Sequence, residues 1–333
     1  MKRLALLFLI FLFPFGAGAQ GEPLKVVATS SILADVARSV GGEYVTVTAL
    51  IPAGADGHAW QPRPADVLHV AQADLVLAVG IGYETFLGQL VDNAADVPQV
   101  VVSNGIPILP FGGHNMDDHD EAGHEEYIGL YGEAGVCADD PHEATAEAGH
   151  DDELAHGACD PHVWTDPTNV MIWADNIAAA FAAADPDHAG EYQANAAAYR
   201  EQLTALDADV QAALAVVPEA RRVLVTNHEF LGYFAHHYGF TLIGGILGAT
   251  TLDEPDPQRL AALVKTVREL GVPAIFAEVS AASPFAQVVA QEAGIGVVTT
   301  LYSESLSAAD GPAATYLDYL RYNAQQIAAA LAE

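Results

Sequence analysis

Two kinds of segment alternate along both halves of this 333-residue chain, and this alternation limits the folds open to it. Short β-branched runs are each followed by a stretch with apolar residues at helical spacing. The strand-like runs of the first half are 24–30, 44–51, 74–80 and 98–106. Those of the second half are 221–227, 240–246, 272–279 and 295–302. Strands that alternate with helices pair in parallel. We therefore predict an α/β fold with two lobes, each with a mainly parallel sheet flanked by helices.

A long Ala-rich segment separates the two halves. From Asp187 to about Val217 the residues have high helix propensity, and the apolar ones form a drifting stripe. A chain of this length also exceeds a typical single core. We expect one long rigid linking helix over 185–217, between an N-terminal lobe over 24–184 and a C-terminal lobe over 218–333.

The first residues have the pattern of an export signal. Lys2 and Arg3 precede an apolar run, and Ala17-Gly18-Ala19 is typical of a cleavage site. The run is shorter than the roughly 20 residues that span a bilayer, although a retained anchor is the alternative. We predict a signal peptide over 1–19 and a mature protein that is periplasmic or otherwise extracytoplasmic, and soluble after cleavage.

The charge balance is strongly acidic. Twelve basic residues against 44 acidic residues give a formal net charge of −32, and no Lys or Arg lies between Arg63 and Arg200. Such a surface repels nucleic acid and anionic lipid, and it attracts cations. We therefore expect no nucleic-acid partner.

Residues 112–158 break the alternating pattern. Six histidines lie there among many carboxylates: His114, His119, His124, His142, His150 and His156. Without hydrophobic periodicity, the segment is predicted to be a mobile, solvated loop. Two interpretations stay open, namely a weak collector of metal ions and an insertion without a binding role.

The chain has two cysteines, Cys137 and Cys159. Because an exported protein meets an oxidising compartment, we expect a Cys137–Cys159 disulfide. A soft metal site that uses both thiolates is the alternative.

Four separate positions carry the residue types that zinc prefers: His58, His162, His228 and Glu304. Three of them follow predicted strands, and the fourth, His162, follows the rigid Asp160-Pro161 turn. The carboxyl ends of parallel strands are where α/β folds place ligand groups. Asp160 or Asp166 is expected to orient the His162 ring, and Trp164 to wall the site. Three imidazoles and one carboxylate would complete a tetrahedral shell with no position open for a reacting water.

The chain resembles the zinc-binding solute-binding proteins of metal ABC importers, of the cluster A-I type. The stretches that carry the resemblance are "PAGADGHAWQPRPADV", "DPHVWTDP", "NHEFLGYFAHHYGF" and "GPAATYLDYLRYN". The resemblance implies metal ligands at His58, His162, His228 and Glu304, an inner-membrane ABC permease as partner, and no enzymatic activity. It also implies metal release by local loop movement rather than wide opening of the lobes. The family commonly has Asp where this chain has Glu304.

The metal and the function are predicted from these ligands. Imidazoles suit zinc, manganese prefers oxygen, and related manganese receptors have a carboxylate where His228 stands. We therefore expect Zn²⁺ as the transported ligand. The affinity for zinc should decrease as the pH drops below about 6.5, because imidazole then becomes protonated. We also expect the protein to be a monomer. The alternatives are a zinc-dependent hydrolase with Glu229 as base, a manganese-binding relative, and an adhesin.

Overall fold

The computed structural model describes residues 22–87, 90, 97–111, 129–130, 159–247, 250–252, 256–280 and 285–332. The expected signal peptide over 1–19 lies outside these residues. So do Cys137 and all of the His-rich segment 112–158 except residues 129–130. The signal peptide, the disulfide and the character of that segment therefore stay predictions.

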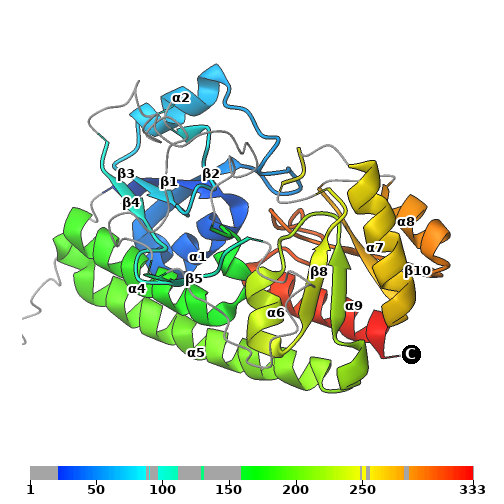
Figure 1. Cartoon of the computed structure of the whole chain (residues 1–333). Coiled ribbons are helices and arrows are strands. Elements are labelled where there is room, and N and C mark those ends of the chain that lie inside the picture. Colours follow the sequence, from blue (N-terminus) through cyan, green and yellow to red (C-terminus); the bar gives the residue numbers. More distant parts are fainter. Residues whose placement is uncertain are drawn as a thin grey trace, which may run out of the picture.

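Two parallel four-stranded sheets form the framework (Figure 1). The first consists, in spatial order, of β2 (Val45–Ile51), β1 (Leu24–Ser30), β3 (Leu75–Ala78) and β4 (Gln99–Val101). The second consists of β10 (Val297–Leu301), β9 (Ala274–Glu278), β7 (Val223–Thr226) and β8 (Thr241–Gly245). A small antiparallel pair joins β5 (Pro107–Ile108) to β6 (Gly129–Leu130). The predicted α/β class with parallel sheets is confirmed.

Helices flank both sheets, and several of them begin and end at the expected signals. Helix α1 (Ser31–Gly41) is capped by Ser30 Oγ, which accepts a hydrogen bond from Leu33 N at 3.1 Å. Gly42 ends α1 with a φ of 58°, a conformation that glycine adopts without strain. The other helices are α2 (Pro64–Ala71), α4 (Pro167–Ala184), α5 (Ala189–Leu214), α6 (Gly232–Tyr238), α7 (Pro257–Leu270), α8 (Phe285–Ala293) and α9 (Tyr316–Leu331).

Helix α5 lies along both sheets and packs on α1, α4 and α9 (Figure 1). Its buried side chains recur at helical spacing and include Tyr199, Leu203 and Leu206. These residues form the apolar stripe that the sequence predicted. The division of the chain into lobes at residues 184 and 217 stays a prediction.

The last helix, α9, adds a second set of contacts between the two sheets. It packs on β10 and on α5, and the backbone nitrogen of Tyr316 donates to Asp35 Oδ2 of α1 at 2.8 Å. One cluster of buried apolar side chains also extends from Val76 of β3 to Phe276 of β9. Separating the sheets would expose this core to water, which is unfavourable.

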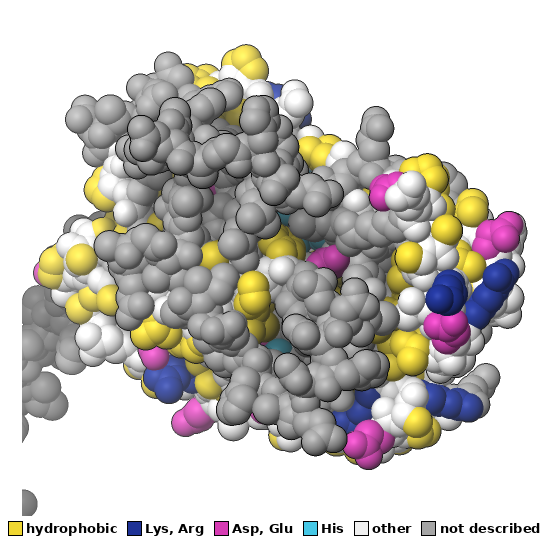
Figure 2. All heavy atoms as spheres, viewed as in Figure 1, with side chains coloured by type: hydrophobic (Ala, Val, Ile, Leu, Met, Phe, Trp, Pro, Cys, Tyr) yellow, Lys and Arg dark blue, Asp and Glu magenta, His cyan; other side chains and the backbone are white. Residues whose placement is uncertain are grey.

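Some of the few basic side chains pair with carboxylates at the surface. Basic and acidic groups lie together over α7 (Figure 2), where Lys265 Nζ is 3.8 Å from Glu269 Oε1. Arg200 Nη1 similarly lies 2.7 Å from Asp175 Oδ2. Within the described part of the chain, no helix has the length and apolar character needed to cross a bilayer.

Candidate metal centre

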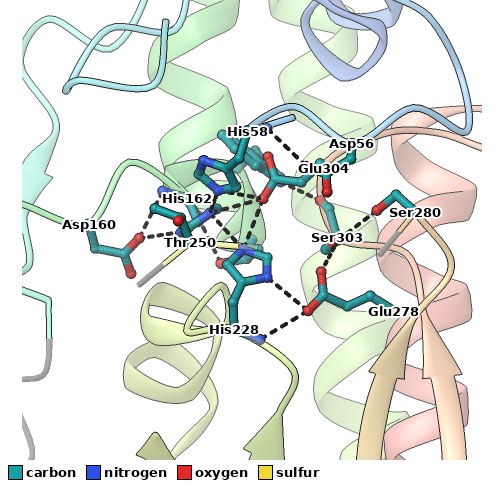
Figure 3. A network of polar contacts seen from close by, with 12 residues as sticks. Asp56, His58, Asp160, His162, His228, Thr250, Glu278, Ser280, Ser303 and Glu304 are labelled. Atoms are coloured by element: carbon teal, nitrogen blue, oxygen red, sulfur yellow. Dashed lines mark hydrogen bonds and ion pairs between the residues drawn. The ribbon is translucent and has the colours of Figure 1, made fainter. Parts of the chain in front are cut away.

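The four predicted ligands converge at one point between the two sheets (Figure 3). His58 lies in the turn after β2, His162 directly precedes a short 3-10 turn, His228 follows β7, and Glu304 follows β10. One candidate ligand atom from each residue lies within 4.8 Å of the other three. His162, His228 and Glu304 are fully buried, whereas the His58 side chain is 10% exposed. The only solvent-facing ligand of this set is therefore His58.

The donor atoms have the spacing that a single ion requires. Glu304 Oε1 lies 3.0 Å from His162 Nε2, 3.1 Å from His228 Nε2 and 3.5 Å from His58 Nε2. His162 Nε2 is also 3.2 Å from His228 Nε2 and 3.4 Å from His58 Nε2. Donors at zinc's bond lengths in a tetrahedron are about 3.3 to 3.4 Å apart. The cluster can therefore accept one tetrahedral ion with little rearrangement.

Asp160 fixes the orientation of His162. Its Oδ1 accepts hydrogen bonds from His162 Nδ1 at 2.7 Å and from the backbone nitrogen of His162 at 2.9 Å. A carboxylate only accepts, so Nδ1 carries a hydrogen, and Nε2 is the nitrogen that faces the centre and is left to bind a metal. Asp166, the other expected partner, instead caps α4 by accepting from Thr168 N at 2.8 Å.

Glu278, a residue to which the sequence pattern assigned no role, fixes the orientation of His228 in the same way. Its Oε1 accepts from His228 Nδ1 at 2.8 Å and from His228 N at 3.1 Å. Its Oε2 accepts from Ser303 Oγ at 2.6 Å. Because Ser303 precedes Glu304, this carboxylate ties two candidate ligands together. The available signal was a glutamate at the carboxyl end of a predicted buried strand.

Aromatic rings wall the cluster and keep water away from it. The Trp164 ring lies 5.3 Å from the His162 ring, and Phe230 stacks on His228 at 5.4 Å. Trp164 Nε1 also donates to Ser303 O at 3.1 Å, which holds the segment that carries Glu304. Trp164 was expected as a wall, whereas Phe230 was missed. Electrostatic interactions are stronger in such a dry environment.

The carboxylates shift the pKa values of the histidines. Burial alone lowers the pKa of His162, but Glu304 and Asp160 outweigh it and raise the pKa to about 9. For His228, burial is likewise outweighed by Glu278 and Glu304, and the pKa rises to about 10. Burial would raise the pKa of Glu304, but the histidines hold it well below its usual value. Without metal, protons therefore take the place of a cation at neutral pH.

Other candidate groups lie away from the cluster. His237 Nε2 is 2.9 Å from Asp207 Oδ1, a contact that joins α6 to α5. Glu229, the base required by the hydrolase alternative, has its Oε1 3.5 Å from Gly245 N, at the end of β8. Four converging protein donors also leave no position for a reacting water. The hydrolase interpretation is therefore not supported.

Comparisons with known proteins agree with this architecture. The family model described as "Zinc-uptake complex component A periplasmic" (ZnuA) matches residues 26–330. The manganese-binding lipoprotein MntA of Halalkalibacterium halodurans is 30% identical over the full length of both chains. The iron-binding protein YfeA of Yersinia pestis is 29% identical over 92% of this chain and 86% of its own.

Among solved structures, the periplasmic zinc-binding protein TroA of Treponema pallidum superimposes with a TM-score of 0.74. It is 25% identical, and the match covers 94% of this chain and 100% of TroA. The expected extracytoplasmic location is thus confirmed, and the family consists of binding proteins rather than enzymes. The chain belongs to the ZnuA family of periplasmic metal-binding receptors of ABC importers.

Proposed function

We propose that this protein captures Zn²⁺ outside the cytoplasm and delivers it to the membrane permease of an ABC importer. The ligands are His58, His162, His228 and Glu304. The observation that carries the proposal is the convergence of three Nε2 atoms on one carboxylate oxygen, within 4.8 Å of one another. The receptor binds and releases the ion without chemical change.

The likeness to relatives leaves the metal open, since their names specify manganese, iron and zinc. The donor set supports zinc. Three imidazole nitrogens and one carboxylate form a closed tetrahedral shell of the kind that zinc accepts, whereas manganese favours oxygen-rich shells of higher coordination. His228 is decisive here because it supplies nitrogen at the position where the resemblance places a carboxylate in manganese receptors.

Manganese is the second candidate, and one observation favours it. Glu304 Oε2 is fully buried and has no hydrogen-bond partner among the described residues. If this oxygen also bound the ion, the shell would contain five donors and two oxygens, which suits manganese better.

Metal analysis of the protein purified from its native source, followed by competition calorimetry, tests the proposal. We expect zinc in about one equivalent and a Kd for Zn²⁺ well below that for Mn²⁺. The His228→Asp variant should shift preference toward Mn²⁺, because it exchanges a nitrogen donor for oxygen. Manganese as the native metal, with tighter Mn²⁺ than Zn²⁺ binding, would contradict the zinc assignment.

Release of the metal ion by movement of one local segment agrees with the packing that connects the two sheets. The apolar core and helices α5 and α9 connect both sheets, so wide opening would expose a large buried surface. The turn that carries His58 is the part of the cluster nearest to solvent, since the other three ligands are fully buried. We expect this turn to move first when the permease takes the ion.

A further inference from the structure

Two buried oxygens beside the metal centre make no hydrogen bond of full geometry with the described residues. They are the Tyr83 hydroxyl and Glu304 Oε2. Tyr83 is 2% exposed and Glu304 is fully buried, so bulk solvent does not reach them. A buried polar atom without a partner costs free energy, and each such atom in a native structure calls for an explanation.

Gly57 leaves open the space that the two oxygens share. A Cβ at this position would overlap the Tyr83 hydroxyl and come within 2.9 Å of Glu304 Oε2. Gly57 is buried and directly precedes the candidate ligand His58. Any side chain at residue 57 would therefore stand between the hydroxyl and the carboxylate.

A strained turn places Tyr83 at this point. Gly80, Ile81 and Gly82 have φ values of 87°, 58° and 74°, and Ile81 is the one non-glycine residue with positive φ in the described part of the chain. A β-branched residue in this conformation is strained and persists only where its surroundings hold it.

The half-buried side chain of Glu84 holds the turn. It accepts from Val79 N at 2.6 Å, Gly80 N at 2.9 Å and Thr29 Oγ1 at 2.6 Å. The Tyr83 ring then packs 6.2 Å from the His58 ring and 5.1 Å from Trp164. This fixed turn therefore directs the hydroxyl toward the metal centre.

We propose that Tyr83 is a positioning residue that sets metal preference: its hydroxyl donates a hydrogen bond to Glu304 Oε2 in the metal-loaded protein and keeps that oxygen off the ion. Glu304 then binds through Oε1 alone, and the shell stays at three nitrogens and one oxygen. This inference rests on the proposed function and deepens it. Without the hydroxyl, Oε2 is free to bind, and the larger shell favours Mn²⁺ relative to Zn²⁺.

The Tyr83→Phe variant removes only the hydroxyl oxygen. Partners that orient metal ligands typically contribute 10- to 100-fold in affinity, so we expect the Zn²⁺-over-Mn²⁺ preference to fall by about tenfold. Tyr199→Phe is the matched control, because Tyr199 is also a buried tyrosine without a hydroxyl partner among the described residues, but lies on α5. Its metal preference should equal that of the unmodified protein.

Co²⁺ in place of zinc reports the coordination number directly. The unmodified protein and Tyr199→Phe should give the intense visible absorption of tetrahedral Co²⁺. Tyr83→Phe should give the weaker spectrum of a five-coordinate ion. A purely structural role for Tyr83 would not produce this change.

A double substitution tests the role of Gly57. Gly57→Ala should displace the Tyr83 hydroxyl and lower the zinc preference. In Gly57→Ala/Tyr83→Phe the clash with the Tyr83 hydroxyl is gone, although the new Cβ still lies 2.9 Å from Glu304 Oε2, so the double variant should lose less zinc preference than the two single losses added together. If the double variant lost as much zinc preference as the two single variants added together, this result would contradict the idea that residue 57 and the Tyr83 hydroxyl compete for the same space.

The inference is overturned if Tyr83→Phe keeps both the metal preference and the Co²⁺ spectrum of the unmodified protein. It is also overturned if Tyr83→Phe binds neither metal while remaining folded. A preference of the unmodified protein for Mn²⁺ would instead contradict the zinc proposal. In that case, the difference in metal preference between the unmodified protein and Tyr83→Phe would still decide the role of Tyr83.

Discussion

Glu278 Oε1 accepts hydrogen bonds from both the backbone nitrogen and the Nδ1 of His228, at 3.1 and 2.8 Å. Two contacts to one oxygen fix the position of the residue and the tilt of its ring. They also leave Nε2 as the nitrogen that can bind a metal. The orientation of this candidate ligand thus depends on a carboxylate that lies outside the four-residue cluster.

Glu278→Gln should weaken zinc binding by roughly 10- to 100-fold, because a neutral amide holds the His228 tautomer less firmly. Isothermal calorimetry with a competing chelator measures this effect. Glu269→Gln is the control, since Glu269 forms only an exposed pair with Lys265 in α7 among the contacts described. Equal affinities of the two variants would contradict the orienting role of Glu278.

His162→Ala should abolish most high-affinity zinc binding, because it removes a fully buried donor that lies within 3.4 Å of three other donors. His69→Ala serves as the control, because His69 is exposed on α2. Both proteins should remain folded by circular dichroism. An unchanged calorimetric affinity in His162→Ala would refute the ligand assignment.

Zinc affinity should rise with pH, and this rise should occur at higher pH values than the pKa of an ordinary histidine would give. Neighbouring carboxylates outweigh burial and raise the pKa of His162 to about 9 and that of His228 to about 10, so protons compete with zinc for these rings at pH 7. Zinc must displace these protons, so affinity should increase by up to roughly tenfold per pH unit for each proton, and level off above about pH 9 to 10. From the sequence alone, we expected zinc affinity to decrease only below about pH 6.5.

Calorimetry at pH 7 in two buffers of different ionisation enthalpy counts the protons released. We expect about two per zinc ion. A pH-independent affinity between pH 7 and 9, with no proton release, would disagree with the electrostatics of the cluster.

Zinc should stabilise the fold, because its four ligands come from segments far apart in the chain. At free zinc about 1,000 times Kd, binding adds about 4 kcal/mol to the free energy of unfolding. Differential scanning calorimetry should show a higher unfolding temperature with zinc, and a chelator should reverse the shift. His228→Ala should show no zinc-dependent shift; the full shift in that variant would place the stabilising ion elsewhere.

The fold was readable from the sequence because strand and helix periods alternate so regularly. The four candidate ligands were also identifiable, since each lies in a Gly- or Pro-containing turn or at the carboxyl end of a strand. The structure brings all four together. Their role as ligands stays a prediction.

Glu278 and Tyr83 could not be found in the same way. Glu278 ends β9, and β9 lies between β10 and β7 in the second sheet. This order places its carboxylate between Ser303 and His228, and a single sequence does not reveal strand order. Tyr83 depends on the positive φ of Ile81, which local propensity disfavours.

Anomalous diffraction at the zinc edge, from crystals of the full mature protein loaded with one equivalent of zinc, tests the central claim most directly. We predict a single strong peak about 2.0 to 2.2 Å from the Nε2 atoms of His58, His162 and His228 and from Glu304 Oε1. A peak outside this cluster, or one with a water in place of any of the four side chains, would contradict the account.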